Sequence, residues 1–453
     1  MNIHNKNLSR RHLINKGVGL ATSMFASNIF AQEANSPASL KRSGKTLLNF
    51  RAWERYPASD IPEMNKFLDR NPDLSIQWVS APFSRYRDAI ATEFIANTPL
   101  DIVQIPEADL AAWADSGWLM PLDGMKNLDD ILKKATPTAV AGTKAINGKI
   151  YALPYLSDAF GFAYDVESLN KAGFAKPPRN LDELRKQMQV VKKAGIDEFP
   201  LSLAMKKQPG QFWSLWATLY ASGGEFFDES LAPVFDKSGH PLLPILEWYV
   251  AAMNDWKITG AFDLQRDWGA SRTAMRSGTV KFGYMSQYAL AEFNVWPESK
   301  VTGKIRMSLI PGLEKNNIGT VGYAHSVGIA ESTKNKEAAW LALRSYAGAD
   351  DSGAYTIPRA RLLSEGGRSP YPSLIEDEEV KKLVSQMNGG NSSEFNTLSK
   401  IGKQRRGIKS VWYAEWEMFM MSQIQEALLK KTTVKSALTA SANEARRLAK
   451  SSK

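Results

Sequence analysis

The sequence predicts an α/β fold built on a parallel, doubly wound sheet. Three short apolar runs have the pattern of strands, and two amphipathic stretches between them have the pattern of helices, so the order is β-α-β-α-β. Strands that alternate with helices in this way form parallel sheets. The expected strands span residues 46–52, 74–79 and 100–105, and the expected helices span residues 61–70 and 86–97.

The loops after these strands are the first candidates for a ligand site. In open α/β sheets, ligands lie beyond the carboxyl ends of the strands, where the connecting loops gather. We therefore expect ligand contacts from Trp53 and Glu54 after the first strand, and from Glu107 and Asp109 after the third. The loop at residues 81–83 follows the second strand and lies at the same edge.

A helix start is encoded near residue 180. Asn180-Leu-Asp-Glu183 follows two prolines and has the spacing of a capping box. Four apolar residues then recur at helical spacing, and we expect them in the core: Leu181, Leu184, Met188 and Val191. Further helices are expected at residues 243–255, 334–346, 411–429 and 434–449, and further strands at residues 280–285, 305–310 and 326–330.

The composition is that of a globular protein with more than one core-forming unit. The chain has 453 residues, of which 43% are apolar, 23% charged and 10% aromatic. It contains no cysteine, which excludes disulfides, thiolate zinc sites, cysteine nucleophiles and lipid-modified cysteine anchors. The formal charge of +10 is not gathered into a basic block with interleaved aromatics, so we expect no nucleic-acid partner.

The N-terminal segment has the pattern of an export signal. It contains four bases and no acid before Glu33, and Arg10-Arg11 precede an apolar run over residues 17–31 that is too short to cross a membrane as a helix. The paired arginines resemble a twin-arginine signal. We expect residues 1–31 to be a signal peptide cleaved near Ala31, residues 32–45 to be an unstructured lead-in, and the mature protein to be periplasmic without a membrane anchor.

The sequence contains few residues that match common catalytic or cofactor-binding motifs. Only His240 and His325 lie beyond the leader, and neither H-E-x-x-H nor G-x-S-x-G occurs. Residues 142–149 miss the phosphate-loop pattern, because five residues separate the two glycines and Ile150 replaces the Ser or Thr that would hold Mg²⁺. We expect no catalytic residue, no metal site and no cofactor, and enzymatic activity has no support in the sequence.

A series of motifs runs through the chain in a fixed order. Asp101-Ile-Val precedes Trp113-Ala-Asp-Ser-Gly-Trp-Leu-Met-Pro-Leu-Asp123, and Gly148-Lys-Ile-Tyr-Ala-Leu-Pro154 precedes Phe162-Ala-Tyr-Asp165. The series resembles family 1 of the extracellular solute-binding proteins and covers residues 46–448. Asp165 stands where that family usually has Asn, and Val321 stands where a second glycine is common. Matching segments follow at residues 169–173, 181–184, 223–228, 274–278, 309–312 and 322–329.

The resemblance implies a periplasmic-binding-protein fold of type II. Two discontinuous α/β lobes would be joined by a hinge, hold a ligand in the cleft between them, and deliver it to the transmembrane subunits of an ABC permease. We expect a monomer whose chain crosses between the lobes near residues 155–160 and 284–287. One lobe would comprise residues 46–157 plus 287–350, and the other would comprise residues 158–286 plus 351–448.

The resemblance also implies further ligand contacts. In the maltose-binding relatives, an acidic residue at the position that matches Asp158 binds sugar hydroxyls, and Trp213 and Trp216 match an aromatic cluster that stacks on sugar. Other candidates follow from their place in the chain: Ser286 and Gln287 at the expected second crossing, Gly322, Tyr323 and His325 in a glycine-rich turn, and Trp412 on an expected helix. The spacing of Trp412, Glu415 and Trp416 also suits a core stripe.

The expected function is that of a binding subunit for a carbohydrate importer, which does no chemistry on its ligand. Arg359 and Arg361 keep an alternative open, because two guanidinium forks in the cleft would favour a uronate or a glycerol phosphate ester. A polyamine is a further alternative within the class. Alternatives from other classes are an exported carbohydrate-active enzyme that uses two acids, and an input domain for chemotaxis or a sensor kinase.

Overall fold

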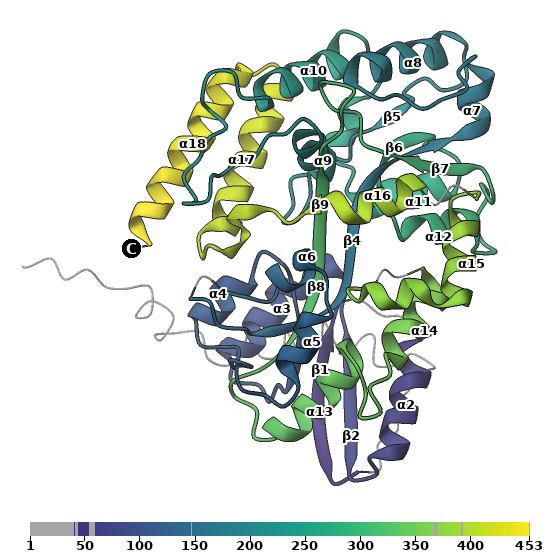
Figure 1. The fold of residues 1–453 in the computed structure, drawn as a ribbon. Helices are drawn as coiled ribbons and strands as arrows, with labels where there is room; N and C mark the ends of the chain where they lie inside the picture. The colour runs from purple at the N-terminus through teal and green to yellow at the C-terminus, as the bar shows by residue number, and fades with distance from the viewer. Residues whose placement is uncertain are drawn as a thin grey trace, which may run out of the picture.

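Two groups of helices and strands are joined by two long strands, β4 and β8, which run through the middle of the molecule (Figure 1). The computed structural model describes residues 40, 44–53, 59–145, 147–366, 369–390 and 393–452. The strands are β1 (Thr46–Ala52), β2 (Leu74–Ser80), β3 (Ile102–Ile105), β4 (Ala152–Asp165), β5 (Leu201–Ser202), β6 (Phe282–Ser286), β7 (Ile305–Ser308), β8 (Thr320–Ile329) and β9 (Gly402–Lys403).

The sheet is parallel only in part. Its order is β2-β1-β3-β8-β4-β6-β5, with β7 beside β4 and β9 beside β8. Strand β1 pairs in parallel with β2 and β3, as the β-α-β-α-β pattern predicts. The expectation of a wholly parallel sheet is wrong, because β8 is antiparallel to both β3 and β4, although β5 pairs in parallel with β6. One long strand leads the chain out of the first group and the other leads it back, so the two must run in opposite directions.

Strand β4 runs from the first group into the second and includes the expected crossing residues 155–160. Its first half pairs with β8, and its second half pairs with β6 and β7. The second expected crossing, near residues 284–287, is wrong. Ser286 still lies opposite Phe160, and β7 pairs with the distal end of β4, so the chain returns to the first group along β8. The segment 287–319 therefore stays in the second group.

The first group, lobe 1, contains β1 to β3, the parts of β4 and β8 beside them, and the helices that cover them. The expected helices at residues 61–70, 86–97 and 334–346 are confirmed. Leu40, expected in an unstructured lead-in, is instead buried in the core, and residues 1–31 lie outside the described residues. The helices are α2 (Asp60–Arg70), α3 (Phe83–Ile95), α4 (Leu110–Asp115), α5 (Leu128–Lys133), α6 (Pro137–Ala141), α13 (Lys336–Ala347) and α14 (Thr356–Glu365).

The second group, lobe 2, contains β5 to β7, β9 and most of the later helices. The α-helices are α7 (Val166–Lys171), α8 (Leu181–Lys193), α9 (Trp213–Ala221), α10 (Leu242–Asn254), α11 (Trp268–Arg276), α12 (Ala289–Asn294), α15 (Glu378–Met387), α16 (Ser393–Ile401), α17 (Tyr413–Leu428) and α18 (Val434–Ser451). Short 3-10 helices are η2 (Ala261–Leu264), η3 (Pro372–Glu376) and η4 (Arg406–Lys409).

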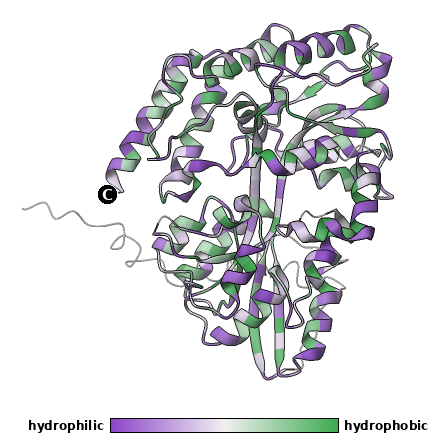
Figure 2. Cartoon of the chain, viewed as in Figure 1, coloured by the Kyte–Doolittle hydropathy of each residue, from purple (hydrophilic) through white to green (hydrophobic). Residues whose placement is uncertain are grey.

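Helix α8 forms as its sequence predicts. The side chain of Asn180 accepts a hydrogen bond from the backbone N–H of Glu183 at 2.8 Å, and this bond satisfies one of the free donors at the helix start. The four apolar residues expected in the core are all buried. The outer helices of both lobes carry both hydrophobic and hydrophilic residues (Figure 2), as helices that pack one face on a core do. Among the described residues, no helix combines the length and apolarity that crossing a membrane requires.

A buried ion pair fixes α14 within lobe 1. The Nη2 atom of Arg361 lies 2.9 Å from Oδ1 of Asp60 on α2, and its Nη1 donates to the backbone carbonyl of Tyr155 on β4 at 3.0 Å. The guanidinium also lies over the rings of Tyr155 and Tyr346. Arg361 is therefore a structural residue of lobe 1, which corrects both its candidacy as a ligand residue and the expectation that lobe 2 resumes at residue 351.

Removing only one member of this pair should destabilise the protein strongly. We expect Arg361→Met to lower the free energy of unfolding by about 3–5 kcal/mol, because the Asp60 carboxylate stays buried without its cation. Urea denaturation of the two proteins measures the difference. Arg359→Met is the matched control on the same helix, since its ion pairs are solvent-exposed and worth about 0–1 kcal/mol. Equal losses in the two variants would contradict the structural role of Arg361.

Candidate ligand-binding site

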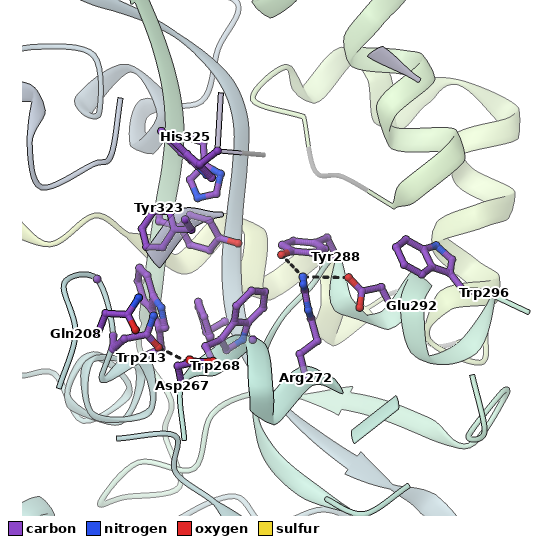
Figure 3. A pocket seen from close by; sticks show the side chains of 16 residues that line it. Gln208, Trp213, Asp267, Trp268, Arg272, Tyr288, Glu292, Trp296, Tyr323 and His325 are labelled. Carbon is purple, nitrogen blue, oxygen red and sulfur yellow. Dashed lines mark hydrogen bonds and ion pairs between the residues drawn. The ribbon is translucent and has the colours of Figure 1, made fainter. Parts of the chain in front are cut away.

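Two adjoining cavities lie between the lobes. The larger has a volume of about 470 Å³ and the smaller about 140 Å³. Both cavities are bounded by residues from lobe 1, from lobe 2 and from β8. The larger one is lined by Trp53, Phe83, Phe160, Gln208, Gly210, Gln211, Trp213, Asp267, Trp268, Gly269, Arg272, Tyr288, Glu292, Trp296, Tyr323 and His325 (Figure 3).

Aromatic residues at the carboxyl end of β1 form the lobe 1 wall. The backbone N–H of Trp53 donates to Oε1 of Gln104 on β3 at 2.8 Å, which fixes the turn after β1. The Trp53 ring then meets Phe83 at 5.7 Å and His325 of β8 at 5.5 Å, in both cases edge to face. These contacts pack the rings of Trp53, Phe83 and His325 against one another at the cavity wall. This wall of the cavity lies at the carboxyl end of β1.

Arg272 organises the lobe 2 wall. Its Nη1 atom donates to Oη of Tyr288 at 2.5 Å and lies 3.0 Å from Oε1 of Glu292 (Figure 3). Its guanidinium also lies over the Trp268 ring, 4.6 Å from the ring centroid. Burial raises the pKa of Glu292, while Arg272 and Arg276 beside it act in the opposite direction. One cation therefore holds two rings and a carboxylate in a fixed arrangement.

The remaining acid of the larger cavity is also engaged. One oxygen of Asp267 accepts from the backbone N–H of Ala270 at the start of α11, at 2.8 Å. Its other oxygen lies 3.3 Å from Nζ of Lys206. Both charges that could dominate the cavity, the Arg272 guanidinium and the Asp267 carboxylate, thus have partners of opposite sign. The cavity is polar but carries little net charge.

The smaller cavity contains two predicted acids. Oδ1 of Asp109 lies 2.7 Å from Nη2 of Arg87, and Oε2 of Glu107 lies 2.9 Å from Nη2 of Arg405. Burial raises the pKa of Asp109 to about 6, although Arg87 acts in the opposite direction. Tyr323 and His325 on β8 border this cavity as well as the larger one.

Comparisons with known proteins identify the family of this chain. The sequence profile of the family described as bacterial extracellular solute-binding protein matches residues 52–351. The chain belongs to this family. A relative of the solute-binding protein, the mannitol-binding protein of Pseudomonas aeruginosa, is 24% identical over 334 residues, which are 70% of this chain and 74% of that protein.

Solved structures of two-lobed binding proteins share the fold. The maltose-bound MalE3 of T. maritima matches with a TM-score of 0.75 at 21% identity, and the alignment covers 89% of this chain and 100% of that one. An ABC transporter solute-binding protein from Agrobacterium vitis S4 with bound D-mannitol matches with a TM-score of 0.68 at 20% identity, covering 90% of this chain and 99% of that one. The type II fold predicted from the sequence is confirmed.

Six of the predicted site residues of the solute-binding protein line the cavities. They are Trp53, Glu107, Asp109, Trp213, Tyr323 and His325. The ring of Trp213 stacks on Phe160 at 4.8 Å and lies 4.7 Å from the Arg405 guanidinium, so protein groups already contact the ring expected to stack on sugar. Glu54 lies outside the described residues.

Four predicted residues lie in or next to strands of the sheet and do not line the cavities: two are on the crossing strands β4 and β8, and two are at the end of β6. The carboxylate of Asp158 accepts from the backbone N–H groups of Ala159 at 2.7 Å and Tyr288 at 3.0 Å, so it orders the chain after β6. Gln287 donates to the carbonyl of Phe395 and fixes α16. The remaining two are Ser286, which is buried in β6, and Gly322, which faces the backbone of Gly402 in β9.

The other three predicted residues belong to the core or the surface. Trp216 is 1% exposed and packs against Phe226, and Trp412 packs against Phe227. Arg359, on the outer side of α14, pairs with Asp377 at 2.8 Å and Glu379 at 2.6 Å. The two arginines that supported an anionic ligand therefore both act elsewhere.

The lobe 2 wall was missed from the sequence, although a signal for it exists. Trp268 and Arg272 are four residues apart on α11, and Tyr288, Glu292 and Trp296 repeat every four residues around α12. Each set places an aromatic ring and a charge on one helix face. Because the two sets belong to different helices, the sequence does not show that these faces of α11 and α12 meet.

The unfolding free energy of the solute-binding protein should depend on pH because of Asp109. Because its folded pKa of about 6 lies above the value of about 3.9 in unfolded chains, the carboxyl contributes stability below pH 4 that is lost as the pH rises through 6. The wild type should lose stability between pH 4 and pH 7, whereas the Asn side chain does not titrate. We therefore expect the unfolding free energy of Asp109→Asn, relative to that of the wild type, to increase by up to about 3 kcal/mol between pH 4 and pH 7. Urea denaturation at both pH values measures this increase, with Asp115→Asn, an exposed position on α4, as the control. A pH-independent difference would contradict the raised pKa.

Proposed function

We propose that this protein is the exported binding subunit of an ABC importer and that it takes up a neutral carbohydrate, a sugar or a polyol. The observation that carries the proposal is the character of the larger cavity, which combines many aromatic rings with charged groups that neutralise one another. A sugar or polyol offers hydrocarbon surface to rings and hydroxyls to paired donors and acceptors. The volume of about 470 Å³ lies within the usual range for small-ligand sites.

The charge balance of the cavity favours a neutral ligand over an anion or a polyamine. Among the described residues, the charged ones that line the larger cavity are Asp267, Arg272 and Glu292. Arg272 is paired with Glu292, and Asp267 with Lys206 outside the lining, so each of these charges has a partner of opposite sign. A uronate or phosphate ester would need a cation that is free to bind it. A polyamine would likewise need free carboxylates. The names of the mannitol-binding relative and of the maltose-bound and mannitol-bound structures support the carbohydrate class.

Binding without chemistry distinguishes the proposal from an exported carbohydrate-active enzyme. The acids of the larger cavity, Asp267 and Glu292, are held by a helix N-terminus and by arginines, which suits a static site. Periplasmic location and cleavage near Ala31 remain part of the proposal, because the leader lies outside the described residues. A role as a sensor input domain would use the same cavity and would differ only in the membrane partner.

Calorimetric titration of residues 32–453 with D-mannitol, D-glucitol, maltose, glucuronate and spermidine tests the ligand class. We expect a polyol or sugar to bind with a dissociation constant in the micromolar range, about −8 kcal/mol, and to be recovered chemically unchanged. Glucuronate and spermidine serve as the charged controls. Preferential binding of either one would overturn the assignment of a neutral ligand, and conversion of the sugar would identify an enzyme.

The Trp268 ring should contribute strongly to that affinity. We expect Trp268→Ala to raise the dissociation constant of the best neutral ligand about 10- to 100-fold, since one ring face and the support of Arg272 are lost together. Trp256→Ala is the matched control, because Trp256 packs against Trp248 and lines neither cavity. Equal effects of the two substitutions would mean that the larger cavity is not the binding site.

A further inference from the structure

The buried guanidinium of Arg405 lies between carboxylates of the two lobes. Its Nη1 atom lies 2.5 Å from Oε1 of Glu417 on α17, within its own lobe. Its Nη2 atom lies 2.9 Å from Oε2 of Glu107, in the loop between β3 and α4 of lobe 1. Arg405 is 2% exposed, so water contributes little to its solvation. The contact with Glu107 is a charge-assisted link across the interlobe boundary.

Both oxygens of Glu107 are held by consecutive residues of one segment. Gln404 Nε2 donates to Oε1 at 2.9 Å, while Arg405 Nη2 donates to Oε2. This segment is anchored in lobe 2, because the adjacent Arg406 donates to the backbone carbonyl of Phe227 at 3.2 Å. The carboxylate of lobe 1 therefore fits into a two-donor clamp that lobe 2 supplies.

The clamp is connected to the walls of both cavities. Oε2 of Glu417 accepts from the backbone N–H of Gly210 at 3.1 Å, and Gly210 lines both cavities. Trp213, which also lines both, lies with its ring 4.7 Å from the Arg405 guanidinium. A ligand that contacts Trp213 or the loop of Gly210 therefore contacts residues that touch Arg405 and Glu417, and Arg405 in turn holds Glu107.

We propose that Glu107 is a positioning residue whose carboxylate, seated between Gln404 and Arg405, stabilises the arrangement of the lobes that encloses the ligand. The inference rests on the proposed binding function. It adds a contact between the two lobes that is connected to the walls of the ligand cavities. Glu417 neutralises Arg405 within lobe 2 whether or not the lobes meet. The Glu107 contact exists only when they meet, so its free energy favours the enclosed arrangement alone.

A distance measurement tests the proposal without any ligand. The chain has no cysteine, so Arg85→Cys and Glu298→Cys introduce the only two thiols for spin labels. These exposed positions lie close to Phe83 and Trp296, which line the larger cavity from lobe 1 and lobe 2. We expect Glu107→Gln to move the distribution of label distances toward longer values. Glu337→Gln, at an exposed site on α13, is the control. Identical distributions for Glu107→Gln and the wild type would overturn the proposal.

Binding kinetics with D-mannitol as the probe provide the second readout. We expect Glu107→Gln to raise the dissociation rate constant about tenfold, with a much smaller change in the association rate constant, because the lost contact belongs to the enclosed state. A lower urea midpoint of unfolding with unchanged dissociation would show a merely structural residue and overturn the proposal. If the wild-type protein does not bind D-mannitol, the label distances still decide the role of Glu107, and the titration with the other sugars and polyols decides the proposed function.

Discussion

The structure depends on one constraint, which is that two strands must each serve both lobes. Strands β4 and β8 pair from Ala152 opposite Gly328 to Ala159 opposite Gly322, and they then continue into different surroundings. Close packing around them leaves little room for side chains. A Cβ at Gly328 would lie 2.7 Å from the carbonyl oxygen of Tyr151, and one at Gly322 would lie 3.1 Å from the backbone of Gly402. The glycines of β8 are therefore required where other backbone segments approach the hinge strands.

The lobes are held to these strands by buried polar groups as well as by apolar packing. Arg361 joins α2 and α14 to the carbonyl of Tyr155 on β4, and Asp158 joins β4 to the backbone of Tyr288. Such groups are costly to bury alone, and they contribute geometry more than net stability when paired. Here they fix the orientation of each lobe relative to β4 and β8. This orientation decides which side chains can meet across the cavity.

Charges near the ligand cavities are also paired with charges of opposite sign. Arg272, Arg87 and Arg405 each have a carboxylate partner, and each lies near the ligand space. A paired arginine can still donate to a hydroxyl, but its charge is already compensated, so the site discriminates by hydrogen-bond geometry and ring contact. Arg405 differs from the other two because its second carboxylate comes from the opposite lobe. Recognition of a ligand and apposition of the lobes are thus joined at one guanidinium.

The sequence by itself determined the features that depend on near neighbours in the chain. The cap at Asn180, the helices and strands of lobe 1 and the position of Trp53, Glu107 and Asp109 at the carboxyl edge all follow from periodicity and strand order. Ordered motifs were enough to indicate the family and its fold. Only the tertiary structure decided which of the tryptophans and arginines face the cavity. Trp216 and Trp268 are the same residue type in similar helices, and Arg361 and Arg272 are equally charged. Their burial and partners come from segments far away in the chain, and no local pattern records those contacts.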